Sequence, residues 1–192
     1  MRKILLLIVV LTPFFAEAEF FIKRPLPRSA YSLQYGGSIG WLSVGYHRQT
    51  LNEKIELGLL YGFTPEFNGG EIHSLTLKFN YTPFKIMLAP RLRLEPLQTG
   101  FFICKNFGNN LYLTWPDKYD KGYYWWSNSI RYHLFICSQA SWLLNSEKMD
   151  RIAFYFEANT NDLYLASFLP NKNSFDLDDI FFFGIGAKVY FK

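Results

Sequence analysis

The regular alternation of apolar residues with small or polar ones is the feature that most constrains how this chain can fold. In the closing segment 180–192, IFFFGIGAKVYFK, every second residue from Phe181 to Phe191 is apolar. Gly, Lys and Tyr occupy most of the positions between them. Because successive side chains of a strand point to opposite faces, this pattern predicts a β-strand with two unlike faces. The apolar face must meet either a protein core or lipid.

The same alternation recurs through the rest of the chain. Six earlier segments show it clearly: 42–47, 54–63, 72–81, 97–105, 127–137 and 151–159. Residues 30–37, AYSLQYGG, show it less strongly and supply an eighth strand. Eight such strands predict an all-β fold, a closed antiparallel up-and-down β-barrel, which is a transmembrane β-barrel if the apolar face meets lipid.

The N-terminal segment resembles an export signal. Residues 1–18 combine a basic start, an apolar stretch from Ile4 to Phe15 and the triplet Ala-Glu-Ala at 16–18, which predicts a cleaved signal peptide. Residues 19–192 then form one domain outside the cytoplasm. No later segment approaches about 18 consecutive apolar residues, which excludes a helical membrane protein. The formal charge of +4 is small and unclustered, so nucleic acid is not expected as a partner.

The residues on the second face of each strand distinguish lipid from a protein core. They are mostly Gly, Ser, Thr and Asn, which suit the packed interior of a narrow barrel, whereas a soluble barrel needs a charged exterior. We therefore expect an apolar series to face outward: Leu57, Leu59, Phe79, Phe101, Ile130, Leu134, Phe154, Phe183 and Ile185. We expect five charged residues to face inward, with an acid contacting the arginine: Glu56, Lys78, Arg131, Glu157 and Lys188.

The segments between the strands differ in length. TLNE at 50–53 and TPFK at 82–85 predict tight turns, whereas 64–70, 106–126 and 159–179 are long and rich in Asn, Asp and Gly. Outer-membrane barrels have short turns at one end and long loops at the other. The segment 138–150 is predicted as a long connection at the end where short turns are expected.

The signal peptide, the glycine-punctuated strands and the closing FFFGIGAKVYF resemble small outer-membrane β-barrels of Gram-negative bacteria, the eight-stranded class that includes the OmpA membrane domain and the lipid A deacylases. Such barrels commonly end in Phe, whereas here Lys192 follows Phe191. The resemblance implies assembly by the outer-membrane insertion machinery and residence in the cell outer membrane, in contact with outer-membrane lipid and lipopolysaccharide. The resemblance is architectural and carries no function by itself; the residues favour a structural or surface-binding role.

Two other functions remain open on the sequence. One is an envelope-lipid (lipid A) modifying hydrolase or acyltransferase, and the other is a secreted lipocalin-like binder of an apolar ligand. Lipid A deacylases use a His-x-Ser pair, which does not occur here, and adjacent His73 and Ser74 fall on opposite faces. The catalytic candidates are Ser129, His133 and Glu157, which share the expected interior face. A satisfied polar interior is the competing interpretation.

An aromatic segment and two cysteines complete the candidates. Eight residues of WPDKYDKGYYWW could form an external binding loop or an aromatic girdle: Trp115, Asp117, Lys118, Tyr119, Tyr123, Tyr124, Trp125 and Trp126. Cys104 and Cys137 lack metal-ligand spacing, and we expect no metal and no cofactor. Both should point inward at opposite rims, about ten residues apart, which is too far for a disulfide.

Overall fold

The computed structural model describes residues 28–68, 70–114, 127–172 and 176–192. Within them the chain forms nine strands: β1 Ser29–Gly36, β2 Leu42–Thr50, β3 Ile55–Thr64, β4 Ile72–Tyr81, β5 Ile86–Ala89, β6 Leu92–Phe107, β7 Ile130–Leu143, β8 Met149–Asn161 and β9 Phe182–Phe191. A short helix, α2, spans Asp162–Phe168, and 3-10 turns η1 and η2 span Glu66–Asn68 and Leu177–Asp179. No helix of the described residues is long and apolar enough to cross a membrane.

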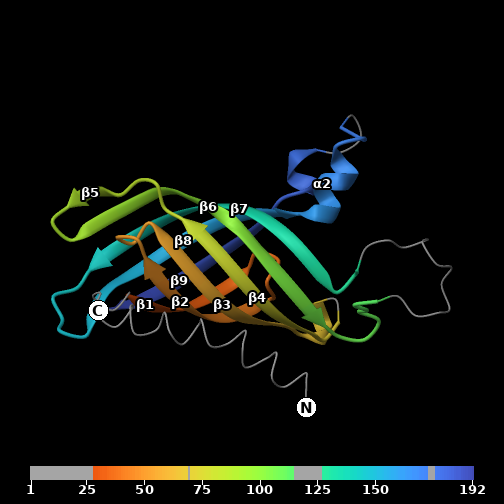
Figure 1. Ribbon diagram of the computed structural model, residues 1–192, viewed down its shortest axis with the longest axis horizontal. Coiled ribbons are helices and arrows are strands. Elements are labelled where there is room, and N and C mark those ends of the chain that lie inside the picture. The colour runs from red at the N-terminus through yellow and green to blue at the C-terminus, as the bar shows by residue number, and fades with distance from the viewer. Residues whose placement is uncertain (1–27, 69, 115–126, 173–175) are drawn as a thin grey trace, which may run out of the picture.

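Eight of these strands form a closed antiparallel barrel (Figure 1). Neighbouring strands follow the order β4, β3, β2, β1, β9, β8, β7, β6, and β6 pairs back onto β4. The weakest sequence prediction, 30–37, is confirmed as β1, which pairs with both β2 and β9. The predicted eight-stranded up-and-down barrel is therefore the observed fold.

The strand β5 lies outside the ring and corrects one expectation. A tight turn at 82–85 was expected to lead into a strand at 97, but the chain first forms a hairpin of β5 and β6 that projects beyond the barrel (Figure 1). The register of β6 against β7 shifts between Glu95 and Gln98, around Pro96. A β-bulge can accommodate a proline inside a strand. Strand β6 therefore begins at Leu92, before residue 97, where a strand was expected to begin.

A second correction concerns 138–150, which is not a long loop. Strand β7 continues to Leu143 and β8 begins at Met149, so the connection is only 144–148. We call the end of the barrel with the segments 51–54, 82–91 and 144–148 the turn mouth. The end with the β1–β2, β3–β4, β6–β7 and β8–β9 connections is the loop mouth. The long connection predicted at 138–150, at the end where short turns are expected, is therefore wrong.

The two faces of the barrel are arranged as predicted. Seven of the nine residues expected outside are exposed, and Phe79 and Ile130 are half-buried in the same outward-facing series. Four of the charged residues expected inside are buried: Glu56, Lys78, Glu157 and Lys188. An apolar cluster shares the interior with them: Ile39, Leu60, Phe102, Cys104, Phe135, Cys137 and Tyr155.

The two cysteines are buried and unpaired, as expected. Cys104 pairs in register with Arg131, and Cys137 with Gln98, so six residues separate them along either strand. That corresponds to about 20 Å. The predicted separation of about ten residues is wrong because β7 continues beyond Cys137, but the pair still lies well beyond disulfide distance.

Candidate functional site: the barrel interior and its two mouths

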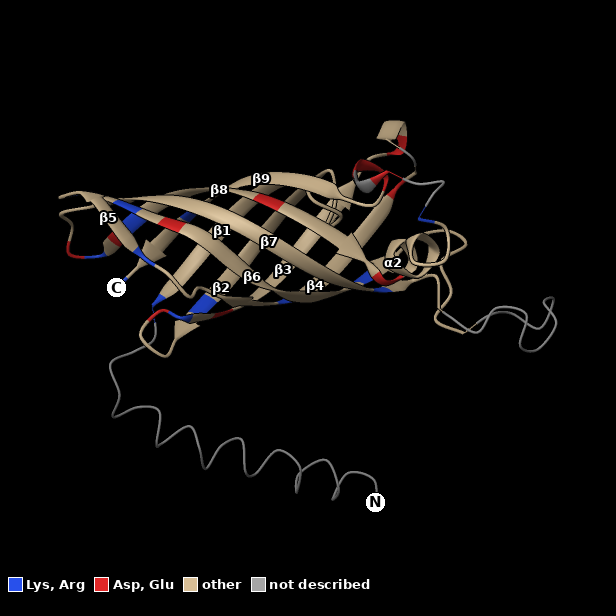
Figure 2. Cartoon of the chain, turned by 90° about the horizontal axis from the view of Figure 1, so that it is seen from above, with Lys and Arg blue, Asp and Glu red and all other residues tan. Residues whose placement is uncertain are grey.

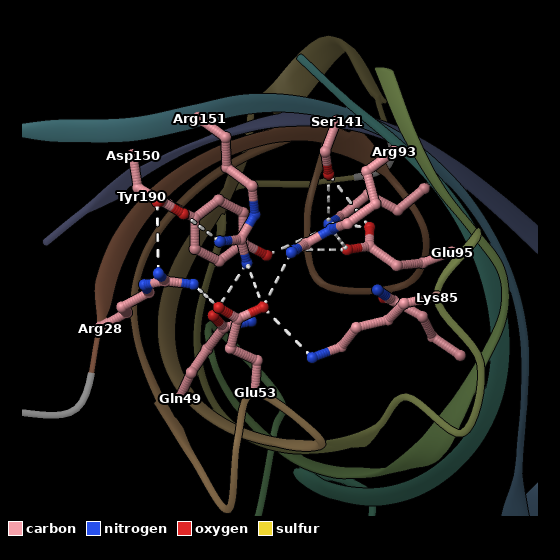
Figure 3. A network of polar contacts seen from close by, with 12 residues as sticks. Arg28, Gln49, Glu53, Lys85, Arg93, Glu95, Ser141, Asp150, Arg151 and Tyr190 are labelled. Atoms are coloured by element: carbon pink, nitrogen blue, oxygen red, sulfur yellow. Dashed lines mark hydrogen bonds and ion pairs between the residues drawn. The ribbon is translucent and has the colours of Figure 1, made fainter. Parts of the chain in front are cut away.

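A cluster of charged side chains closes the turn mouth (Figure 3). Glu53 is its centre: Arg93 Nη1 lies 2.9 Å and Lys85 Nζ 3.2 Å from Glu53 Oε2, Arg28 contacts Oε1, and Arg151 Nη2 lies 3.8 Å from Oε2. The β2–β3 turn places Glu53 there, because residues 51–53 all have positive φ and the chain reverses tightly. One carboxylate therefore joins cations from four separate segments.

The cluster continues into the barrel through Arg93 and Arg151. Arg93 Nη2 lies 2.6 Å from Glu95 Oε1, and Glu95 Oε2 accepts hydrogen bonds from Gln139 and Ser141. Arg151 is fully buried, with its guanidinium 3.7 Å from the centroid of the Tyr190 ring. Its other contacts are the carboxylate of Asp150 and Gln49 Oε1. These ion-paired side chains and the Tyr190 ring together fill this end of the lumen.

Lys85 is the titratable member of the cluster in the connection before β5. Burial, together with the charges of Arg93 and Arg151, lowers its pKa from 10.5 to about 8. Its ammonium still donates hydrogen bonds to Asn52 O and to Glu53 Oε2. Lys85 therefore loses its proton at a lower pH than an exposed lysine.

Two buried ion pairs lie deeper in the barrel. Lys78 contacts Glu157 and lies over the Phe135 ring, 4.3 Å from its centroid. Lys188 Nζ lies 2.5 Å from Glu56 Oε1. Pairing of this kind is what makes burial of such charges tolerable.

The prediction that an acid contacts Arg131 is wrong. Arg131 is half-buried and donates to the backbone carbonyls of Ser127 and Ile130, and no described carboxylate lies within ion-pair distance of it. Glu157 pairs with Lys78 instead. Arg131 is the second residue of β7, near the loop mouth, whereas Glu157 pairs in register with Cys137, six residues farther along β7. The two side chains share a face of the strands but differ in depth.

The interior also contains a Ser, His and Glu arrangement that the sequence analysis missed. Ser32 Oγ and His47 Nε2 are 2.8 Å apart and hydrogen-bonded, and His47 Nδ1 lies 3.3 Å from Glu56 Oε1. Glycines make room for the imidazole: a Cβ at Gly58 would lie 2.5 Å from His47 Nδ1, and one at Gly45 would lie 3.0 Å from Nε2. The register of β2 with β3 places Gly58 opposite His47. No single segment of the sequence indicated this arrangement, because it depends on register.

This arrangement has the connectivity of a nucleophile, base and acid. Its surroundings favour a structural role, because Ser32 is 6% exposed, His47 is 2% and Glu56 is 3%. Glu56 also accepts hydrogen bonds from Gln49, Lys188 and Tyr190, so its charge is already compensated. The three side chains satisfy one another inside a packed barrel.

The three catalytic candidates from the sequence each contact other partners. Ser129 Oγ accepts a hydrogen bond from Lys105, 2.6 Å away. His133 stacks on Phe102 with ring centroids 4.2 Å apart, and its Nδ1 lies 3.3 Å from Asn159 Oδ1. Glu157 pairs with Lys78. The contacts of the described chain therefore do not join these three residues into one site.

The loop mouth contains a cavity of about 330 Å³. Tyr35 and Trp41 line it, with ring centroids 5.7 Å apart, and Thr64, Asn68 and Asn106 add polar groups. A cavity of this size, with aromatic and amide side chains, fits a small ligand. No role was predicted for Trp41 from the sequence. The eight binding residues predicted between Trp115 and Trp126 lie outside the described residues.

Within the described residues, no group of three or more His, Cys, Asp or Glu side chains is arranged to hold a metal ion. No protein-family model matches the chain, and no curated protein matches it significantly.

Proposed function

We propose that the protein is an integral outer-membrane β-barrel with its outer surface in lipid and a structural or surface-binding role. The observation that carries this proposal is a continuous apolar belt. Every strand of the ring contributes a large apolar side chain that is 49% to 66% exposed: Leu33, Val44, Leu59, Leu77, Phe101, Leu134, Phe154 and Ile185. A soluble monomer rarely exposes an apolar surface of this extent.

The barrel interior and the connections support the same proposal. A lipocalin-like binder would hold an apolar cavity inside, whereas this lumen contains the Lys78–Glu157 and Lys188–Glu56 ion pairs. The segments 51–54 and 144–148 are short turns at one end, as in bacterial outer-membrane barrels, and the hairpin of β5 and β6 extends that end. The predicted signal peptide at 1–18 supplies the export that such a location requires. The cavity at the loop mouth is the described feature suited to surface binding.

Arginine substitution at two depths of one strand tests the membrane location. Ile136 lies at the centre of β7 and Trp142 near its end, and both are outward-facing and more than half exposed. The free energy of unfolding is measured in phosphatidylcholine vesicles for Ile136→Arg against Ile136→Ala, and for Trp142→Arg against Trp142→Ala. Because the cost of a cation depends on its depth in the bilayer, the arginine should cost about 2–4 kcal/mol at 136 and about 1 kcal/mol or less at 142.

The alanine variants control for the loss of each native side chain. On the outside of a soluble barrel both arginines would be solvated, and each would change stability by about 0.5 kcal/mol or less. Equal, small effects at the two positions, or failure of the parent protein to insert into vesicles, would refute the proposal.

A further inference from the structure

A shallow apolar groove of about 620 Å³ runs over the outer surface of β1, β9, β8 and β7. Its floor consists of small outward-facing residues, Ser138, Ala140 and Ala187. Larger apolar side chains form its walls: Leu33, Phe154, Phe156 and Ile185. The small floor residues leave space between these larger side chains that a flexible hydrocarbon chain can occupy.

A row of three exposed cations lies on the same side of the barrel, at the turn mouth. Arg48 lies near the end of β2, Lys148 precedes β8 and Lys192 follows β9. Ser29 of β1 pairs in register with both Arg48 and Phe191, and Lys192 N donates to Lys148 O. The three cations therefore follow one another around the rim over β2, β1, β9 and β8.

These cations lack acidic partners. None of them forms an ion pair with any residue that the structure describes, and Lys192 Nζ donates only to the backbone carbonyl of Ser146. Lys and Arg gather at this end, near the C-terminus and β5 (Figure 2). The exposed acids Glu66, Glu71 and Asp176 belong to connections of the loop mouth, whereas Glu147 is an exposed acid of the turn mouth, beside Lys148. Even so, none of the three cations forms an ion pair with a described acid, so the row presents positive charge to the surroundings.

An aromatic cluster lies between the groove and the cation row. Tyr31 packs against Tyr46 and Phe191, with ring centroids 5.4 Å and 5.9 Å away. Amphipathic aromatic side chains concentrate at the level of lipid headgroups, so this cluster marks the boundary between hydrocarbon and headgroups on this side. The cations lie on the headgroup side of that boundary.

We propose that the groove and the cation row form a binding site for a phospholipid with an anionic headgroup. An acyl chain occupies the groove, and the headgroup phosphate lies among Arg48, Lys148 and Lys192. Along β9 the floor residue Ala187 is four residues from Phe191, about 13 Å, a span that an acyl chain covers. Basic residues beside an apolar surface attract anionic lipid. This inference rests on the proposed membrane location.

The test measures lipid retention by protein inserted in nanodiscs of equal dioleoylphosphatidylglycerol and dioleoylphosphatidylcholine. Protein is extracted in mild detergent, and the lipids that copurify are quantified by mass spectrometry. The parent should retain at least about five times as much dioleoylphosphatidylglycerol as dioleoylphosphatidylcholine. One basic residue near an anionic headgroup changes the affinity for the lipid by about fivefold. The variant Arg48→Gln/Lys148→Gln/Lys192→Gln should retain both equally, whereas Ala187→Trp, which fills the groove, should retain less of both.

A matched control lowers the net charge by the same amount at the loop mouth. Lys172→Glu with Asn110→Asp also lowers the formal charge by three, and it should retain lipid as the parent does. Equal retention of the two lipids by the parent, or unchanged selectivity in the triple variant, would overturn the inference. Insertion of the parent into vesicles of pure phosphatidylcholine is measured separately and tests the membrane location alone. The membrane location and the anionic-lipid site can therefore fail independently.

Discussion

At the scale of single residues, alternation predicted which way a side chain points but not what it contacts. Lys78, Glu157 and Arg131 were all expected inside, and Glu157 was available to either cation. The register decides between them, because Glu157 lies at the level of Cys137, far along β7 from Arg131. Lys78 reaches that level from β4 and gains contact with the faces of Phe102 and Phe135.

Removal of Lys78 should destabilise the barrel strongly. In Lys78→Met the Glu157 carboxylate remains buried, with its Oε1 already lacking a hydrogen-bond partner, and loses its cation. An uncompensated buried charge costs about 3–5 kcal/mol, measurable by urea unfolding from vesicles. The double variant Lys78→Met/Glu157→Gln should recover most of that loss. Equal stability of Lys78→Met and the parent would contradict the pairing.

At the scale of elements, the alternation located every strand of the ring, and segment 72–81 coincides with β4, but the turn-mouth ends of β6 and β7 were not predicted. The alternating segment was expected to begin at Leu97, but a bulge around Pro96 lets β6 begin at Leu92. Continued pairing of β6 with β7, such as Leu92 with Trp142, extends β7 beyond Cys137. The extension follows from cross-strand hydrogen bonds, which a single segment does not reveal.

The register of β6 and β7 predicts two free thiols. Cys104 and Cys137 lie six residues apart in register, so no disulfide can join them without a change of pairing. Titration of unfolded, unreduced protein with a thiol reagent should find two reactive groups, and none in the folded protein because both are buried. A mass two hydrogens lower, with no reactive thiol after unfolding, would show that this register is wrong.

At the scale of the whole molecule, the turn mouth is closed by residues from distant parts of the chain. Arg28 precedes β1, Glu53 lies between β2 and β3, Lys85 precedes β5, and Arg151 belongs to β8. Their common contact with Glu53 holds the connections at this end together (Figure 3). Such a cluster exists only after the barrel has closed.

Lys85 makes the stability of this mouth depend on pH. Its folded pKa of about 8 lies below the ordinary 10.5, so between these values the unfolded chain binds more protons than the folded one. The contribution of Lys85 to the free energy of unfolding therefore rises from pH 8 to 10.5. Below pH 8 the residue is charged in the folded protein and destabilises it by the full amount. Lys85→Met removes that cost, so its stability relative to the parent should be greatest at pH 7 and should fall towards pH 10.5.

The measurement is the urea midpoint of both proteins in detergent across this pH range. Lys54→Met, at an exposed lysine of the neighbouring β2–β3 turn, is the control for loss of a lysine. A difference between Lys85→Met and the parent that stays constant from pH 7 to 10.5 would show that Lys85 is not desolvated.

The sequence by itself determined the class of fold and the two faces of each strand, because the period of a β-strand is two and a single segment displays it. The inward direction of Glu56 and Lys188 follows from that period. Only the tertiary structure decided their pairing, because the partners are 132 residues apart and meet through barrel closure. The same holds for Ser32 with His47, for the cluster around Glu53 and for the cation row on Arg48, Lys148 and Lys192, since register and closure decide which inward or outward residues share a level.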